Sequence, residues 1–231
     1  MDGNSKAPAL RLAALFVIAA PAFGAAVDPA MPRFSDRVEV VDELRSVEPV
    51  APGERVEVVF RVGELELVAA DVPDVRTEVG VGCDELSAAR CERYRGNLRL
   101  VARHEDGVVR VSLAGLSRWS LAKLDLKGRV VYPRRAPLAL RLGVGVADLS
   151  AGGRDVEVSM GVGDLTIRSP RVAVGSVALR TRIGDASLAG AAGGSSGRPF
   201  LVGARLEWSE GAGPARIRAR LGVGDARVVL E

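Results

Sequence analysis

A pattern of alternating apolar residues interrupted by glycines constrains the fold of this chain more than any other feature. In its clearest copy, Leu138, Leu140 and Leu142 occupy every second position, which is typical of a β-strand with one buried face. Gly143 and Gly145 follow, and glycine allows backbone angles that residues with a Cβ resist. The pattern therefore predicts a strand that runs into a tight turn, after which a second short strand continues.

The same arrangement returns at nearly regular intervals. A glycine closely followed by an acidic residue occurs at Gly63, Gly82, Gly145, Gly163, Gly184 and Gly224. The steps between these glycines are 19, 63, 18, 21 and 40 residues, close to multiples of a coil of about twenty residues. At three further positions, near Asp106, Asp125 and Gly203, the repeat would place another such glycine, but the pattern of a glycine closely followed by an acidic residue is missing. The periodicity predicts an all-β fold, a single-stranded β-solenoid of about eight or nine stacked coils.

Composition and charge agree with this fold and disfavour one class of function. The chain is 48% hydrophobic but only 4% aromatic, as narrow coils filled with Val, Leu and Ala require. The formal net charge is +3, and arginines alternate with acids along the predicted strands. A nucleic-acid surface needs a concentrated basic patch, so we expect no nucleic-acid partner. The densest basic group is Arg216, Arg218 and Arg220, which we interpret as the solvated outer face of a strand.

The first 26 residues have the organisation of a secretory signal peptide. Lys6 and Arg11 precede a short apolar core over 12–20, and small residues follow over 21–26. The apolar run is shorter than the ~20 residues of a membrane-spanning helix, although an uncleaved anchor stays open as an alternative. We therefore expect an extracytoplasmic protein, periplasmic or secreted, with no membrane span after cleavage.

Two further segments are predicted after the signal peptide. Residues 27–55 are punctuated by prolines, and we expect them to cover the open end of the first coil as an N-terminal cap. Residues 56–231 carry the repeats and form the predicted solenoid domain. Within it, residues 85–95 break the alternation and predict a helical turn or an excursion, and the glycine-rich run 190–197 predicts a loop.

Cys83 and Cys91 are the two cysteines of the chain and lie close to this excursion. In an exported protein an even pair favours a disulfide, which would close a short loop worth about 2–3 kcal/mol. Two free thiols, or a metal or redox role, stay open as alternatives. A disulfide between Cys83 and Cys91 is the possible site feature that we predict.

No pattern in the sequence predicts catalytic, cofactor-binding or metal-binding residues. The Gly-x-Gly-Asp turns are similar to calcium-binding β-roll repeats, but their acids come once per coil rather than in tandem nonapeptides, so we interpret them as turns. His104 is the single histidine, which excludes a histidine-based metal cluster or triad. Trp119 and Trp208 favour packing at coil ends over a ligand platform. We therefore expect no cofactor, no metal and no enzymatic activity.

Several motifs resemble those of a known family. A strand ending in Pro133, the segment 138–145 and the Gly-Val-Gly-Asp of 161–164 resemble the putative adhesin family of bacterial envelope proteins, with its DUF4097-like domain. The tail, over 208–213 and 222–225, is similar to the closing coils of toast-rack and LiaF-like domains. The resemblance covers about residues 50–231. It implies a single-stranded β-solenoid and provides no catalytic residues that could be assigned here.

These features predict a non-enzymatic exported envelope protein, an adhesin-like binding or scaffold module that uses an extended β-solenoid face. Its partner would be another protein or an envelope component, and a homo-oligomer is possible because solenoid ends can stack. One alternative is a regulatory or sensory protein of an envelope-stress pathway. Another is a carbohydrate-active β-helix enzyme, which would need paired carboxylates in a groove and aromatic side chains that stack on sugars.

Overall fold

The computed structural model describes residues 42–83, 88–115, 117–121, 123–191, 198–200 and 203–231. The predicted signal peptide and the first part of the predicted cap lie outside the described residues. The described part contains fourteen strands, two α-helices and one 3-10 helix, so the predicted all-β class is confirmed. None of the described helices is long and apolar enough to cross a membrane.

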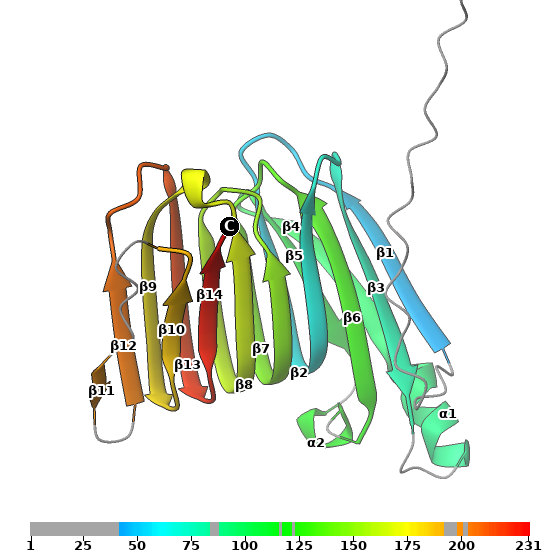
Figure 1. Cartoon of the computed structure of the whole chain (residues 1–231). Coiled ribbons are helices and arrows are strands. Elements are labelled where there is room, and N and C mark those ends of the chain that lie inside the picture. The colour runs from blue at the N-terminus through cyan, green and yellow to red at the C-terminus, as the bar shows by residue number, and fades with distance from the viewer. Residues whose placement is uncertain (1–41, 84–87, 116, 122, 192–197, 201–202) are drawn as a thin grey trace, which may run out of the picture. The chain divides into compact units, whose positions relative to one another are not determined.

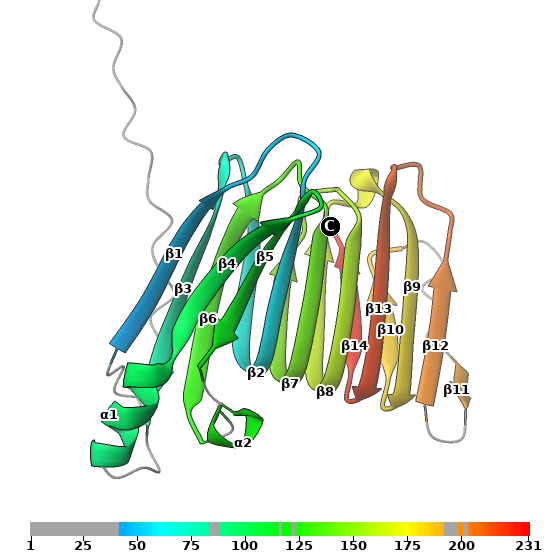
Figure 2. The same ribbon diagram turned by 180° about the vertical axis from the view of Figure 1, so that it is seen from behind.

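The fourteen strands belong to one continuous sheet (Figures 1 and 2). They are β1 (Asp42–Pro49), β2 (Arg55–Ala70), β3 (Asp74–Gly82), β4 (Arg99–Glu105), β5 (Val108–Ala114), β6 (Asp125–Pro133), β7 (Leu138–Ser150), β8 (Val156–Ser169), β9 (Val174–Ile183), β10 (Ala186–Ala189), β11 (Arg198–Phe200), β12 (Gly203–Trp208), β13 (Ala215–Val223) and β14 (Ala226–Leu230). The helices are α1 (Ala88–Asn97), α2 (Arg118–Leu121) and the 3-10 helix Arg171–Ala173.

Long bent strands fold this sheet into two layers. β2, β7 and β8 pair in parallel and in register along both arms of their bends, so Gly63, Gly145 and Gly163 stand side by side. The pairs β13–β14 and β9–β10 make the same bend at Gly224 and Gly184. The first arms form one layer together with β4, β5, β11 and β12, and the second arms form the other with β1, β3 and β6. The bends lie along the lower edge of Figure 1.

Only glycine fits at these bends. The φ angle of Gly163 is +134°, a region that L-residues rarely adopt. A Cβ at this position would also overlap the carbonyl oxygen of Gly145 on the neighbouring strand. The bend reverses which alternate residues face inward, so Val58 and Phe60 are buried before the bend of β2 and Leu65 after it. One core of small aliphatic side chains therefore fills the space between the two arms.

The acidic residue that follows a bend glycine has a structural function. Asp225 Oδ1 accepts a hydrogen bond from the backbone N–H of Asp185, at 2.8 Å, and Asp164 Oδ1 accepts one from the N–H of Asp225, at 3.4 Å. Each carboxylate therefore satisfies an amide of the adjacent bend, where the ladder of backbone hydrogen bonds is interrupted. This arrangement explains why an aspartate follows the bend glycines Gly163 and Gly224.

The strand order differs from that of the solenoid predicted from the sequence. β13 and β14, the last segment of the chain, lie between β8 and the pair β9–β10, so spatial neighbours do not follow sequence order. Antiparallel strands also complete both ends of the sheet, with β1–β3–β6 and the β4–β5 hairpin at one end and β9–β12–β11 at the other. In the described residues five bends stack, where eight or nine coils were expected.

Four of the expected positions are not bends, which explains the difference in number. Gly82, which an acidic residue follows closely in the sequence, ends β3, and the other three positions lacked the glycine–acid pattern. Asp106 and Gly107 form the turn of the β4–β5 hairpin, both with positive φ, because an Asp-Gly pair also suits a tight antiparallel turn. Asp125 begins β6, which pairs antiparallel with β3, and Gly203 begins the antiparallel strand β12. Glycine and acid mark hairpin turns and strand ends as well as bends, and local periodicity does not distinguish them.

The other sequence predictions fall partly within and partly outside the described residues. The described part of the predicted cap forms β1, which pairs antiparallel with β3. The predicted excursion leads into α1, and Cys83 is joined to Cys91 by a disulfide with a Cα–Cα distance of 5.8 Å. Most of the predicted loop 190–197 lies outside the described residues. Val81, Leu98 and Leu126 belong to a small second core cluster at this end of the sheet.

Candidate functional site: an arginine-rich face

The residues considered in the sequence analysis do not assemble into one site. His104 lies on β4, half exposed, with its ring nitrogens 3.7 Å from Glu48 Oε2 and 3.8 Å from Glu54 Oε1. Trp208 packs against the main core, and the side chain of Trp119 lies outside the described residues. Within the described part of the chain, no three His, Cys, Asp or Glu side chains are grouped to hold a metal ion.

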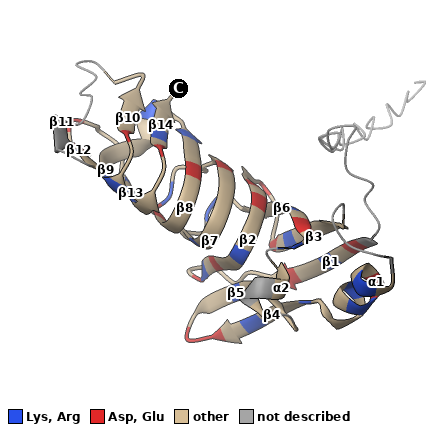
Figure 3. Ribbon diagram, turned by 90° about the horizontal axis from the view of Figure 1, so that it is seen from below, with Lys and Arg blue, Asp and Glu red and all other residues tan. Residues whose placement is uncertain are grey.

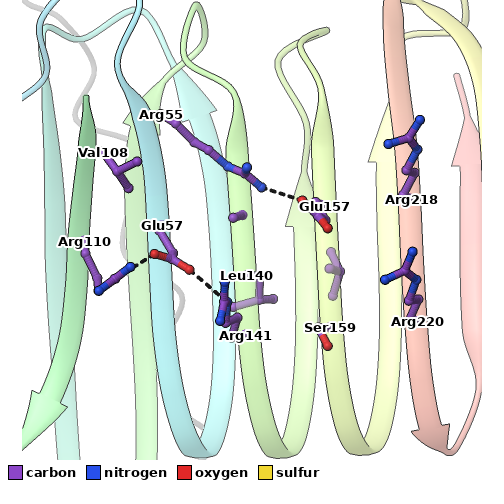
Figure 4. Close-up of a pocket in the computed structure, with 12 residues that line it drawn as sticks. Arg55, Glu57, Val108, Arg110, Leu140, Arg141, Glu157, Ser159, Arg218 and Arg220 are labelled. Carbon is purple, nitrogen blue, oxygen red and sulfur yellow. Dashed lines mark hydrogen bonds and ion pairs between the residues drawn. The ribbon is translucent and has the colours of Figure 1, made fainter. Parts of the chain in front are cut away.

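A shallow hollow of about 440 Å³ lies on the outer surface of the first layer (Figure 4). Strands β2, β5, β7, β8 and β13 contribute its lining, and the outward positions of these strands alternate with core positions. The charged lining residues are Arg55, Glu57, Arg110, Arg141, Glu157, Arg218 and Arg220. Five arginines against two glutamates leave an excess of positive charge on this surface.

Ion pairs hold three of these arginines in place. The carboxylate of Glu57 has only 7% of its side chain exposed and binds two guanidinium groups, Arg110 Nε at 2.6 Å and Arg141 Nε at 2.8 Å. Arg55 Nη2 lies 2.7 Å from Glu157 Oε2. The hydrogen bond to Glu57 raises the pKa of Arg110. These charge-assisted contacts fix the direction of the side chains around the hollow (Figure 4).

The remaining arginines have no such partner. Arg218 and Arg220 on β13 and Arg180 on β9 form no ion pair with a carboxylate in the part of the chain that the structure describes. Both guanidinium groups of Arg218 and Arg220 line the hollow (Figure 4). The hydrogen bond from Arg55 lowers the pKa of Glu157, and the charges of Arg220 and Arg218 lower it further. Three exposed guanidinium groups therefore lack a described carboxylate within ion-pair distance, and Glu157 acts on two of them only at longer range.

Strand register places these arginines in a row across the first layer. Arg220 is opposite Ser159 of β8 on one side and opposite Arg180 of β9 on the other. Ser159 is opposite Arg141, and Arg180 is opposite Arg205 of β12, whose guanidinium contacts Glu207 at 2.6 Å. Neighbouring strands are about 4.8 Å apart, so Arg220, Arg180 and Arg205 follow one another at this step, while Ser159 separates Arg220 from Arg141. We define the arginine face as the set Arg55, Arg110, Arg141, Arg180, Arg218 and Arg220.

Sequence reasoning identified only part of this face. It placed Arg218 and Arg220 on the outer face of a strand, which the structure confirms, but it missed Arg180 and Arg141. These arginines are far apart in the sequence and come together only through the pairing of β7, β8, β13 and β9. One signal was available, because Arg141, Arg180 and Arg220 each lie four residues before a bend glycine. Alignment of the repeats on their glycines would have placed them in one row.

Comparison with known proteins gives no family assignment. No family model matches the sequence, and no curated protein matches it. Among solved structures, a putative cell adhesion protein from Clostridium sporogenes is similar with a TM-score of 0.45 and 13% identity, over 82% of this chain and 100% of that one. A putative adhesin from Parabacteroides distasonis has a TM-score of 0.29 and 8% identity, over 81% and 97% of the two chains.

Proposed function

We propose that this chain is an exported, non-enzymatic binding module that holds an acidic polysaccharide on its arginine face, in an adhesin-like or scaffolding role. The observation that carries the proposal is the set of three neighbouring arginines, Arg180, Arg218 and Arg220, that form no ion pair with a described carboxylate. Like charges so close together repel one another, and an external anion would relieve that repulsion. The guanidinium fork binds carboxylate and sulfate groups through paired hydrogen bonds.

The spacing of the face suits a polymer with repeated anionic groups. Arg220 and Arg180 lie about 4.8 Å apart across the strands, and Arg218 and Arg220 about 6.6 Å apart along β13, the distance between alternate residues. The lining of the hollow contains no aromatic side chain on which a nucleobase could stack. This absence favours an acidic polysaccharide, recognised through its charges, over a single-stranded nucleic acid.

The strands and the core beneath the arginine face hold it in place, so binding should cost little conformational entropy. The arginines stand on parallel strands that pair in register over a packed core, and ion pairs with Glu57 and Glu157 already orient three of them. Preorganised groups lose little side-chain entropy on binding. In this proposal the stacked bent strands act as a short, solenoid-like scaffold for one extended surface.

The chemistry of the two glutamates favours a binding role over glycoside hydrolysis. A hydrolase of this kind needs one carboxylic acid with a raised pKa, which stays protonated and acts as a general acid. Here the pKa of Glu157 is lowered by its hydrogen bond to Arg55, and Glu57 is bound by two arginines. Both carboxylates serve as anchors for arginines, so we infer that the bound polymer is not cleaved.

The proposed location rests on two features of the chain. The predicted signal peptide over 1–26 directs export, and the bond between Cys83 and Cys91 is of a type that persists in oxidising compartments. An extracytoplasmic position would bring the arginine face into contact with acidic polymers of the envelope or of a neighbouring surface.

The proposal is tested by titrating the protein with polygalacturonate in a calorimeter at several salt concentrations. We expect binding that weakens as salt rises, and a loss of at least about tenfold in affinity in the double variant Arg180→Ser/Arg220→Ser, since each charge-assisted contact is worth about 1.5–3 kcal/mol. The single variant Arg220→Ser should also bind more weakly than the parent. Its matched control is Arg227→Ser, which removes one exposed arginine from β14 in the other layer and should bind as the parent does.

Five results would contradict the proposal. Unchanged affinity in the double variant would show that the arginine face is not the site, and equal losses in the control would show that binding follows net charge alone. Equal affinity for dextran, a neutral polymer, would exclude recognition of charge. Incubation with the polymer, followed by measurement of its chain length, tests the non-enzymatic role, and shortening would identify an enzyme instead. Stronger binding of single-stranded DNA would favour the nucleic-acid alternative.

A further inference from the structure

Exposed apolar side chains gather along the outer edge of the bends. Of the seven large hydrophobic residues with high exposure in the described part of the chain, five lie there, and Val144, Val162, Val223 and Ile183 are each 40–49% exposed. Register places these four side by side with Val62, in the order Val62, Val144, Val162, Val223, Ile183. We define this continuous apolar row as the valine ridge. Scattered apolar residues are normal on a surface, whereas a contiguous row indicates an interaction site.

An open groove runs beside the ridge on the side of the first layer. The row next to the ridge contains Gly143, Gly161 and Gly222, with Arg61 at one end and Arg182 at the other. Because glycine has no side chain, this row forms a floor that is lower than the ridge. The groove has a volume of about 860 Å³ and lies over β2, β7 and β8, where Gly143 and Gly161 line it together with Phe60, Leu142 and Met160. Along these three strands the groove runs parallel to the ridge, and Gly222 continues the glycine row beyond it.

The two flanks of the ridge carry opposite charges. On the groove side lie Arg61 and Arg182, with the arginine row beyond them. On the other side, just after the bend glycines, lie the exposed acidic residues Glu64, Asp164, Asp225 and Asp185. Figure 3 views this edge from below, with acidic positions in red and basic positions in blue.

From this arrangement we propose that the bend edge is a self-association surface, where the valine ridge of one copy packs into the glycine-floored groove of a second copy. If a two-fold axis runs parallel to the ridge, each strand of one copy faces the same strand of the other copy. The rotation also reverses the two sides of the ridge, so that opposite flanks meet. The acidic flank of each copy then faces the basic flank of the other, and Asp185 of one copy approaches Arg182 of the other. An axis across the ridge would instead place arginines against arginines, which is unfavourable.

The size of this surface determines the expected strength of association. Five strands about 4.8 Å apart, and a width of about five residues, give a contact on the order of 400 Å² for each copy. A total of about 800 Å² is below the standard interface of about 1,200–2,000 Å² and belongs to the weak, reversible class. We therefore expect a dimer that forms between micromolar and millimolar protein, and its existence does not depend on the proposed polysaccharide ligand.

Sedimentation equilibrium on the exported protein, from micromolar to millimolar concentration and without polysaccharide, tests this inference. We expect a reversible monomer–dimer equilibrium that Val162→Lys weakens at least about tenfold, because it places a charge in the apolar centre of the contact. Val162 is 45% exposed, so the fold should survive, as circular dichroism would show. Val172→Lys is the matched control, since Val172 is 85% exposed and lies in the 3-10 helix rather than on the ridge.

Charge reversal tests the orientation of the two copies. Arg182→Asp and Asp185→Arg should each weaken the dimer, and the double variant should restore it, because the two positions face one another across the two-fold axis. The inference is overturned if the parent protein stays monomeric throughout, if Val162→Lys dimerises as the parent does, or if Val172→Lys weakens the dimer equally. Failure of the double variant to restore association would overturn the proposed pairing of the flanks.

Discussion

Replacement of Gly163 by alanine should destabilise the protein more than any comparable change at its surface. Two independent effects act at this position. The φ angle of +134° lies in a region where a Cβ clashes with the residue's own backbone. The added Cβ would also overlap the carbonyl oxygen of Gly145, which belongs to the adjacent bend and is fixed by parallel pairing on both sides.

The magnitude follows from adding these two effects. A non-glycine residue in a sparsely populated backbone region costs about 1–3 kcal/mol. Forcing an extra carbon into a packed site costs about 1–3 kcal/mol more through displacement of its neighbours. We therefore expect Gly163→Ala to lower the free energy of unfolding by about 4 kcal/mol, a large part of the ~5–15 kcal/mol of a typical domain.

Two other glycines separate the contributions in a denaturant titration. Gly53 has φ of +90° and open space where a Cβ would lie, so Gly53→Ala should cost only the backbone strain, about 1–2 kcal/mol. Gly161 lacks a positive φ, but its Cβ would overlap the carbonyl oxygen of Gly143, so Gly161→Ala should cost about 1–3 kcal/mol through displacement alone. If Gly163→Ala costs no more than Gly53→Ala, the close stacking of the bends is not what requires glycine.

Three further predictions concern the disulfide, the acidic residues at the bends and the ion pairs of the arginine face. Non-reducing mass spectrometry should show one disulfide between Cys83 and Cys91, and its reduction should lower the free energy of unfolding by about 2–3 kcal/mol. Complete alkylation of both cysteines without reductant would contradict this prediction. Asp225→Ala should lower the free energy of unfolding by about 1 kcal/mol through loss of the hydrogen bond from the Asp185 amide, and Asp225→Asn should lower it less. A shift of the parent's Tm on adding calcium would contradict a purely structural role for the acidic residues. Because Arg55 lowers the pKa of Glu157 in the folded protein, this pair stabilises the fold above the ordinary glutamate pKa of 4.5, and the contribution disappears as pH falls through the lowered value. The difference in unfolding free energy between the parent and Glu157→Gln should therefore be constant near neutral pH and shrink below about pH 4.5, by a small amount because the pair is half exposed.

Local features of the sequence determined the strands and the positions of their bends. Alternation in 138–142 and 226–230 predicted strands that the structure contains, because burial on one face of a strand repeats every second residue. The glycines of the repeat marked the bends for a similarly local reason, since positive φ and close backbone approach both require the absence of a Cβ. The break in the pattern near Cys91 was likewise visible, and α1 begins there.

The tertiary structure alone decided the order of the strands. Gly163-Asp164 and the Asp106-Gly107 pair are similar as sequence, yet one forms a bend of the folded sheet and the other a hairpin turn. The sequence near β13 and β14 also does not show that they lie between β8 and the β9–β10 pair. The alternating pattern of a strand is the same whichever parallel strand pairs with it. Strand order depends on packing of the whole core, which a window of about twenty residues does not contain.

The arginine face and the valine ridge depend on both the local sequence and the tertiary structure. The phase of the repeat places Arg141, Arg180 and Arg220 at equivalent positions relative to their glycines, and the sequence therefore determined that each faces outward. That Arg180 and Arg220 are neighbours, and that neither forms an ion pair with a described carboxylate, follows only from the tertiary structure. The same register converts single exposed valines into the continuous valine ridge, because pairing across strands joins residues that the chain itself keeps far apart.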